Sequence, residues 1–274
     1  MSQQSAYFEA NKLLWNQRTI IHKDSAFYDL GGFKKGETSL KEIELTELGN
    51  VENKKILHLQ CHFGMDSLSL SRLGATVTGV DFSDEAIETA RKLNDELNLD
   101  AEFICCNIYD LDPSSPQNPL KTQAGKFDIV FTSYGVIGWL PDLDKWAAII
   151  SNYLKPGGFF YMVEFHPVIW MFDDEFRYFQ YAYNNSGVIE TDSTGTYTDH
   201  NAEIKAKEYC WNHGISEVLN PLINCGLQIE FFNEYDYSPF NCFRNTVPDG
   251  KGNFHIKGLE NKIPMLYSIK ATKK

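Results

Sequence analysis

One stretch of the sequence, residues 56–83, constrains the fold of this chain more than any other. A short apolar run at 56–59 enters a tight turn, a helix-like segment follows, and a β-rich run at 76–80 ends in Asp81. A strand–helix–strand order of this kind predicts a right-handed crossover between two parallel strands. The turn and Asp81 are then expected at the carboxyl edge of the sheet, where open α/β sheets bind nucleotide-like ligands.

Apolar runs alternate with helix-like segments over most of the chain. The runs predicted as strands are residues 56–59, 76–80, 101–105, 127–132, 159–165, 227–235 and 265–271. Helices are expected after Ser83, whose side chain can cap one, and at 146–154 and 216–225. This alternation predicts a parallel sheet with helices packed against it, and residues 113–126 are expected to form a loop insertion.

The length of 274 residues and the hydrophobic content of 43% are ample for one large domain. We predict a single domain over 1–274, with an N-terminal helical lid at 1–50, a ligand-binding core at 51–165, an aromatic and β-rich insertion over the active site at 166–210, and a segment at 211–274 that completes the sheet. In the lid, Gly31, Gly32 and Gly36 are expected to interrupt the helices. The aromatic residues of the insertion suit a lid over a partly apolar substrate, or else they pack on the N-terminal helices or a second subunit.

Charge and composition indicate which classes of molecule this chain can bind. The net charge of −12 argues against nucleic acid, because phosphate binding needs an accumulated positive surface. No apolar run approaches the ~18 residues needed to cross a bilayer, and the N-terminal segment lacks a secretory signal pattern. The six cysteines form no C-x-x-C pair and are expected to be reduced. We therefore expect a cytoplasmic monomer or homodimer that acts on a small molecule, away from membranes and nucleic acid.

The turn after the first strand indicates which kind of nucleotide-like ligand is expected. A dinucleotide fingerprint needs three spaced glycines, whereas this chain has Gln60, His62 and Met65 at those places. The lysine of a phosphate-binding P-loop is also missing. A nucleoside without phosphates fits better, because the carboxylate of Asp81 can accept hydrogen bonds from both hydroxyls of a ribose.

The ordered motifs resemble the class I methyltransferases that depend on S-adenosylmethionine (SAM). The motifs that carry the resemblance are His58 to Gly64, Gly79 to Ser83, Cys106 to Tyr109, Phe127 to Val130 and Leu154 to Gly158. The resemblance implies a Rossmann-like fold, with a mostly parallel seven-stranded sheet, an antiparallel C-terminal strand and helices on both faces. It also implies SAM as the cofactor and S-adenosylhomocysteine (SAH) as the product.

The resemblance assigns cofactor-binding positions along the core. The turn residues Gln60, Cys61, His62 and Gly64 fall at the methionine end of SAM, although only Gly64 keeps a glycine of the family pattern. Asp81 with Phe82 falls at the ribose, and Ser133 with Tyr134 falls near the methionine amino group and the substrate. Asn107 with Ile108 falls at the adenine, where the family usually has an aspartate; an asparagine carbonyl can still accept from the adenine amino group.

Further positions lie outside this core. Trp15, Arg18 and Tyr28 resemble lid positions over the cofactor, and Arg18 can pair with the methionine carboxylate. Glu164 and His166 lie at the end of the fifth strand, where either can act as a base toward the methyl acceptor. No metal site is predicted, because the strand that holds His58 ends before His62 and the two histidines share no face.

The string LHLQCHFGMDSLSLSRLGA, with WLPDL and EFHP further on, resembles a bacterial subgroup of small-molecule methyltransferases. The sequence therefore favours an enzyme that transfers a methyl group from SAM to a small molecule by in-line displacement. A SAM-binding sensor or partner protein without turnover is an alternative, because the glycine turn is rewritten. A nicotinamide-dependent oxidoreductase and a nucleic-acid methyltransferase are further alternatives, disfavoured by the missing glycines and by the acidic charge respectively.

Overall fold

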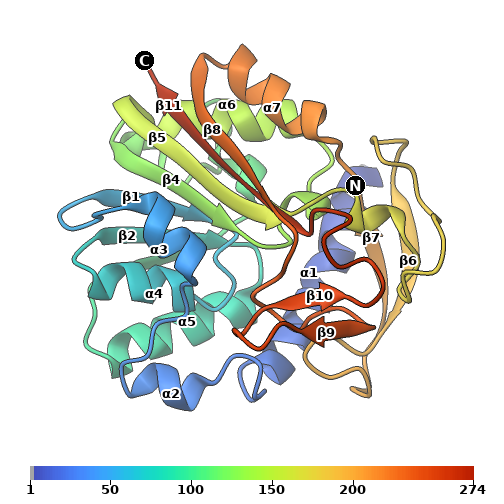
Figure 1. Cartoon of the computed structure of the whole chain (residues 1–274). Helices are drawn as coiled ribbons and strands as arrows, with labels where there is room; N and C mark the ends of the chain where they lie inside the picture. Colours follow the sequence, from blue (N-terminus) through green and yellow to red (C-terminus); the bar gives the residue numbers. More distant parts are fainter. Residues whose placement is uncertain (1–2) are drawn as a thin grey trace.

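The structure is a computed structural model that describes residues 3–274, and a seven-stranded sheet runs through its centre (Figure 1). The strands in spatial order are β3 (Glu102–Cys105), β2 (Thr76–Asp81), β1 (Lys55–Leu59), β4 (Phe127–Ser133), β5 (Leu154–Phe165), β11 (Leu266–Lys273) and β8 (Leu227–Tyr235). Strands β1 to β5 pair in parallel, and β11 runs antiparallel to both of its neighbours. The predicted Rossmann-like sheet with an antiparallel last strand is confirmed.

Helices cover both faces of this sheet (Figure 1). One face packs against α3 (Glu42–Leu48), α4 (Met65–Arg72) and α5 (Asp84–Glu96), and the other against α6 (Leu143–Tyr153) and α7 (Ile215–Asn224). Successive residues of β1 face opposite layers, so that Ile56 joins the α3–α4 layer and Leu57 joins the α6–α7 layer. Both β1 residues are fully buried, which is why the strands read as continuous apolar runs.

Local signals set several helix ends. The hydroxyl of Ser83 accepts from the backbone N–H of Ala86 at 3.1 Å and caps α5, as predicted. Helix α7 includes Pro221 and ends just before Gly226, whose φ of 83° suits a helix terminus. The predicted helix at 146–154 begins slightly earlier, because Asp142 caps Lys145 N at 3.0 Å.

The prediction that Gly31 and Gly32 interrupt the helices is wrong. Both lie inside the short helix α2 (Leu30–Lys34). Asp29 caps this helix by accepting from the backbone N–H of Gly32 at 3.0 Å. A Cβ on Gly32 would lie 2.5 Å from Oδ2 of Asp29, so the missing side chain makes room for the cap. The helix ends before Gly36, which has a φ of 110°.

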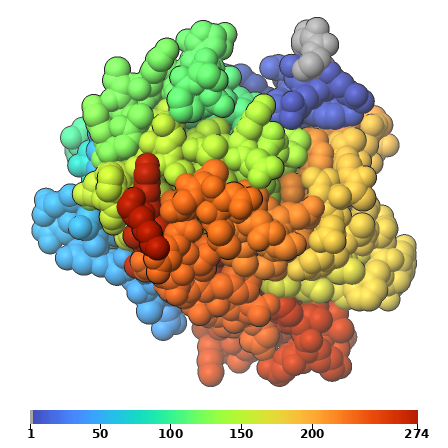
Figure 2. All heavy atoms as spheres, turned by 90° about the horizontal axis from the view of Figure 1, so that it is seen from above, coloured from blue at the N-terminus to red at the C-terminus, as the bar shows by residue number. Residues whose placement is uncertain are grey.

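Two further pieces lie beyond the carboxyl edge of the sheet. Helix α1 (Gln3–His22) packs against a two-stranded hairpin of β6 (Ile189–Thr194) and β7 (Lys205–Cys210), and we call these two elements the cover (Figure 1). A second pair, β9 (Thr246–Pro248) and β10 (Phe254–Ile256), lies near the same end. Viewed from above, the blue N-terminal helix adjoins the yellow-to-orange residues of the hairpin at the surface (Figure 2).

The described residues 3–274 contain no helix that is both long and apolar enough to cross a membrane. All six cysteines are free thiols. Within the same residues, no three histidine, cysteine or acidic side chains come together as ligands for a metal ion.

Candidate active site

The turn after β1 has an unusual backbone. Gln60 and His62 have φ values of 56° and 50°, and Gly64 follows with a φ of 82°. Residues with side chains rarely adopt this left-handed region. At Gly64 a glycine is required in addition by packing, because a Cβ would lie 2.7 Å from the ring of Phe103. The turn therefore keeps its tight geometry while it carries two large polar side chains.

Asp81 lies at the end of β2, beside this turn, and is 8% exposed. Its Oδ2 accepts from the backbone N–H of His62 and its Oδ1 from that of Ser83, both at 2.9 Å. Burial raises the pKa of Asp81 to about 6, and the backbone hydrogen bonds limit that rise. At neutral pH the carboxylate is thus charged, and each oxygen keeps a lone pair for a further donor.

The segment after β3 contains the two residues predicted near the adenine. The side-chain oxygen of Asn107 accepts from the backbone N–H of Tyr109 at 3.0 Å and caps the short helix η1 (Ile108–Leu111). Ile108 is buried in the apolar layer that also contains Val80. Phe82, predicted with Asp81, accepts from the thiol of Cys105 through its carbonyl oxygen. The structure thus brings Asp81, Asn107 and Ile108 to one edge of the sheet.

The backbone of the loop after β4 donates hydrogen bonds to the side chain of Glu164. This carboxylate is 1% exposed and accepts from the backbone N–H groups of Gly135 (2.5 Å), Val136 (2.7 Å) and Ile137 (3.2 Å). A fourth bond comes from Phe165 N at 2.6 Å. A carboxylate has about four lone-pair positions, so these donors occupy them. The geometry supports a role for Glu164 in positioning the loop, and the predicted role as a base has no free lone pair to act through.

The two loops of the site are joined by one side chain. The amide nitrogen of Gln60 donates to the carbonyl of Val136 at 2.9 Å. The amide oxygen of Gln60 is buried and has no hydrogen-bond partner in the described part of the chain. Beside it, Ser133 donates to Asp66 (3.2 Å) and Tyr134 to Glu44 (2.7 Å). The predicted residues Gln60, Ser133 and Tyr134 therefore lie around one loop.

His166 lies on the other side of β5. Its Nε2 is 3.1 Å from a carboxylate oxygen of Glu234, and its Nδ1 accepts from the backbone N–H of Val168 at 3.2 Å. Burial lowers the pKa of His166, and the charge of Glu234 opposes that shift. The structure thus places His166 next to the end of β8, apart from the Gln60–Val136 contact.

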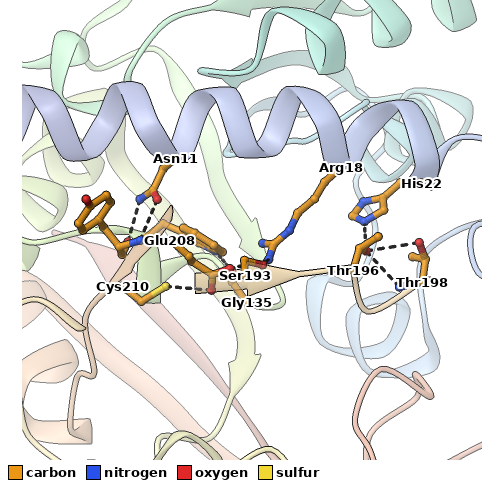
Figure 3. Close-up of polar contacts among 11 residues, drawn as sticks. Asn11, Arg18, His22, Gly135, Ser193, Thr196, Thr198, Glu208 and Cys210 are labelled. Atoms are coloured by element: carbon orange, nitrogen blue, oxygen red, sulfur yellow. Dashed lines mark hydrogen bonds and ion pairs between the residues drawn. The ribbon is translucent and has the colours of Figure 1, made fainter. Parts of the chain in front are cut away.

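Two side chains of α1, Trp15 and Arg18, were predicted to lie over the cofactor. The ring of Trp15 lies 5.4 Å from that of His62 and 5.2 Å from that of Trp139. Arg18 is 8% exposed and pairs with Glu208 of β7, Nη2 to Oε2 at 2.5 Å (Figure 3). Trp15 therefore packs against the turn, and Arg18 lies beside the rings of Trp15 and Trp139.

Aromatic and histidine rings form a cluster against the turn, and only two of them, Tyr28 and His62, were predicted from the sequence as site residues. His22 is fully buried and its Nε2 lies 2.6 Å from the hydroxyl of Thr196. Its ring is 5.3 Å from that of His62, and the hydroxyls of Tyr28 and Tyr197 lie 2.5 Å apart. Burial is the main cause that lowers the pKa of His22 to about 2 and that of His62 to about 3. Both imidazoles are therefore neutral above the site.

Residues 56–158 match the family model described as a methyltransferase domain. These residues contain the turn after β1, Asp81 and the loop after β4, which are the parts of the site described above. Residues 56–158 are therefore a methyltransferase domain, and the fold around them is that of the class I SAM-dependent methyltransferases.

Two curated relatives illustrate the extent of the similarity. The ubiquinone biosynthesis O-methyltransferase of Actinobacillus pleuropneumoniae serotype 5b is 34% identical over 105 residues, which are 38% of this chain and 43% of that protein. An uncharacterized methyltransferase of Synechocystis is 29% identical over 139 residues, 50% of this chain and 59% of that protein. The match thus spans roughly half the length of these relatives.

Solved structures extend the similarity of fold to most of the chain. A putative SAM-dependent methyltransferase from Listeria monocytogenes superposes with a TM-score of 0.58 at 18% identity, over 85% of this chain and 97% of that one. The geranyl diphosphate C-methyltransferase of Streptomyces coelicolor A3(2) gives a TM-score of 0.56 at 14% identity, over 85% and 78%. At these identities the similarity concerns the fold alone.

The segment that matches the methyltransferase domain excludes the whole cover. Trp15, Arg18 and Tyr28 precede residue 56, and Glu164 and His166 follow residue 158. The contacts that these residues make therefore lie outside the part of the chain that the family model matches.

Proposed function

We propose that this methyltransferase transfers the methyl group of SAM to a small-molecule acceptor by in-line displacement. The observation that carries the proposal is the geometry of Asp81 at the carboxyl edge of the sheet, within a matched methyltransferase domain. Its carboxylate is anchored by His62 N and Ser83 N and keeps a free lone pair on each oxygen. That arrangement suits the two adjacent hydroxyls of a ribose.

Two unpartnered polar atoms support the fit of the amino-acid end of SAM. The amide oxygen of Gln60 and Nε of Arg18 are buried without a hydrogen-bond partner among the described residues. An unpartnered acceptor suits an ammonium group, and an unpartnered guanidinium donor suits a carboxylate. Buried polar groups of this kind are costly unless a ligand completes them. When bound, SAM supplies a methyl group that is already activated by its sulfonium.

The residues of this chain would then act mainly by holding the cofactor and the acceptor in place and by enclosing them. Asp81 holds the ribose, Asn107 and Ile108 border the adenine, and Gln60 with Arg18 orients the amino-acid end. Glu164 fixes the loop that includes Gly135, against which the acceptor would be aligned. Alignment of donor and acceptor contributes roughly 7–11 kcal/mol to the rate of such reactions. The cover excludes water from this edge.

The acceptor is proposed to be a small molecule because Asp81 and Arg18 are buried and the chain is acidic. A net charge of −12 disfavours polyanions, and the aromatic rings of Trp15 and Trp139 form an apolar wall. An acceptor with an acidic proton needs a base. His166 is the proposed candidate, and its Nδ1 must first give up the hydrogen bond that it accepts from Val168 N, whereas Glu164 would have to give up four backbone donors.

Calorimetric titration tests the cofactor part of the proposal. The wild type should bind SAM and SAH and should not bind NAD. Asp81→Asn removes the charge and should weaken SAH binding on the order of 100-fold, since charge-assisted hydrogen bonds are the strong ones. Asp84→Asn is the matched control, because Asp84 is an exposed carboxylate whose partners are Lys12 of α1 and the thiol of Cys105. Equal affinity of Asp81→Asn and wild type for SAH would overturn the assignment of the ribose site.

Incubation with isotope-labelled SAM tests the transfer itself. Purified protein is mixed with a cell metabolite extract, and the compounds that gain the labelled methyl group are identified by mass spectrometry. The proposal expects at least one small labelled product that requires Asp81. Tight SAH binding with no labelled product across broad extracts would favour a SAM-binding sensor instead.

A further inference from the structure

Helix α1 is fastened to the hairpin along a single face. Asn11, Arg18 and His22 are spaced by seven and four residues, which places them on one side of a helix. Figure 3 shows all three pointing from α1 toward the hairpin. Asn11 exchanges two hydrogen bonds with the backbone of Tyr209, and His22 contacts Thr196. Arg18 lies between these two neutral contacts and is the charged one.

The guanidinium of Arg18 is only partly used by the hairpin. Its Nη2 donates to the hydroxyl of Ser193 at 3.1 Å and to Oε2 of Glu208 at 2.5 Å. Its Nε is buried and has no partner in residues 3–274. Nε and Nη2 lie on the same edge of the guanidinium, which is an edge that binds a carboxylate through two parallel hydrogen bonds. Glu208 therefore occupies half of a site that a full bidentate carboxylate would fill.

This half-filled edge borders the candidate active site. The guanidinium carbon lies 5.3 Å from the ring centre of Trp15 and 5.5 Å from that of Trp139. Trp15 packs on His62, and the indole N–H of Trp139 donates to the carbonyl of Gly135 at 2.9 Å. Arg18 thus contacts one residue above each of the two loops, so an anion held between those loops can reach it.

Glu208 has an alternative environment that Arg18 lacks. The side chain of Glu208 is 20% exposed, whereas that of Arg18 is 10% exposed. The other carboxylate oxygen of Glu208 accepts from the thiol of Cys210 at 3.4 Å. Glu208 can therefore turn toward solvent without becoming a buried, unpaired charge, while Arg18 would become one if it lost every carboxylate.

We propose that Glu208 is an internal competitor for the carboxylate of the cofactor's amino-acid end and thereby sets the affinity for the cofactor. In the structure described here Glu208 holds Nη2 of Arg18. The ligand carboxylate takes the Nε–Nη2 edge, and Glu208 moves out to solvent. This inference rests on the proposed function, because it assumes that a SAM-like ligand occupies the edge of the sheet.

Two ligands that differ only at the amino-acid end test this competition. SAH carries the ammonium and carboxylate, whereas 5′-methylthioadenosine keeps the nucleoside thioether and lacks both. Glu208→Gln keeps a side-chain oxygen for Arg18 but removes the competing charge. We expect calorimetry to show SAH binding strengthened on the order of tenfold, with methylthioadenosine binding unchanged. Arg18→Met should remove most of the preference for SAH over methylthioadenosine.

Controls separate the competition from a general effect on the hairpin. Glu190→Gln removes another carboxylate of the same hairpin, one that pairs with the exposed Lys207, and should leave both affinities unchanged. In an Arg18→Met background, Glu208→Gln should no longer strengthen SAH binding, since the contested guanidinium is gone. Thermal unfolding of each variant verifies that the fold is intact.

The outcomes distinguish this inference from the proposed function. If wild type binds neither ligand, the proposed function fails and the inference fails with it. If wild type binds SAH but Glu208→Gln leaves that affinity unchanged or weakens it, the competition alone is overturned. A gain of equal size for methylthioadenosine would also overturn it, because that ligand has no carboxylate to compete.

Discussion

The floor and the cover of the site are held together by different kinds of contact. We define the floor as the turn at 60–64, Asp81 and the loop at 133–137. In the floor, buried carboxylates accept from backbone N–H groups, as when Asp81 binds His62 N and Ser83 N. In the cover, side chains far apart in sequence meet, and Arg18 and Glu208 are separated by 190 positions. The floor is thus built from the order of strands, and the cover from pairing between distant segments.

The same contrast appears in the electrostatics. Burial raises the pKa of Asp81 to about 6 in the floor, and lowers the pKa of His22 to about 2 in the cover. Each shift disfavours the charged form of a buried group, as desolvation does in general. Because one group is an acid and the other a base, acid affects Asp81 and His22 in opposite directions, and His62 of the floor, with a pKa lowered to about 3, responds to acid as His22 does. The pH dependence of stability can therefore distinguish a variant at Asp81 from a variant at His22.

The largest effect is expected from removing the carboxylate that holds the floor. Glu164→Ala leaves four backbone N–H groups, those of Gly135, Val136, Ile137 and Phe165, without their acceptor. We expect the free energy of unfolding to fall by roughly 3–5 kcal/mol, as for removal of one partner in a buried charged network. Urea denaturation measures this change. Glu234→Ala is the control, since the side chain of Glu234 is half exposed and its one ion pair within residues 3–274 is with His166; a similar loss there would contradict the role of Glu164.

A smaller effect is expected at the glycine of the turn. Gly64→Ala combines a left-handed backbone, φ 82°, with a Cβ placed 2.7 Å from Phe103. We expect a loss of roughly 2–4 kcal/mol, from backbone strain and overpacking together. Gly157→Ala is a matched control, because its φ is 78° but nothing lies within 4 Å of the added Cβ. Equal losses in the two variants would show that packing in the floor contributes nothing beyond the backbone.

The floor could be predicted from the sequence because its geometry follows from local patterns. The apolar run, turn, helix and second run fixed the parallel register that brings Asp81 beside Gly64. The cover could not be predicted in this way. Trp15 and Arg18 were expected over the cofactor, but nothing in the spacing of residues pairs Arg18 with Glu208 or His22 with Thr196. Such partners are chosen by the tertiary path of the chain.

For two further residues, the sequence pattern predicted the position but not the contacts. Glu164 was correctly located at the end of the fifth strand, yet its hydrogen bonds to the loop at 135–137 depend on how β4 and β5 pair. Gly32 was read as a helix interruption, whereas it provides space for the cap of Asp29. In both cases the residue type was informative, and the partner that decided its role came from another segment.

Acid should loosen the contact between the cover and the turn at 60–64, where His22 and His62 face each other and both have lowered pKa values. The pKa of His22 is about 2 in the closed cover and ordinary, near 6.5, when exposed, so the open state binds more protons between these values. The closed cover is fully stable above about pH 7 and loses stability as pH falls below 6.5, by about 1.4 kcal/mol per histidine at pH 5.5. Asp81 has the opposite sign, because its raised pKa makes the folded state bind a proton more readily between pH 3.8 and about 6.

Amide hydrogen exchange at pH 5.5 and 7.5, corrected for intrinsic rates, measures this difference. Protection should fall at 189–210 in acid while β1 and β4 stay protected. His22→Phe keeps a ring in the cluster and should reduce the dependence on pH. An equal loss of protection in the sheet would contradict the separation of cover from floor.

The smallest effect, and the sharpest test of whether the cover opens as a unit of its own, is expected at Asn11. This side chain is 1% exposed, donates to the carbonyl of Tyr209 at 2.8 Å and accepts from its N–H at 3.0 Å. Asn11→Ala should cost roughly 1–2 kcal/mol, because two hydrogen bonds are lost while the helix itself favours alanine. Asn220→Ala, at an exposed position inside α7, reports the gain from helix propensity alone. If the cover is a separate cooperative unit, exchange at Tyr209 and its hairpin neighbours rises in Asn11→Ala while exchange in β4 is unchanged. If amide exchange in β4 becomes faster by the same factor, the cover and the floor unfold together. The two regions would then differ in the kind of contact that holds them and would have the same stability.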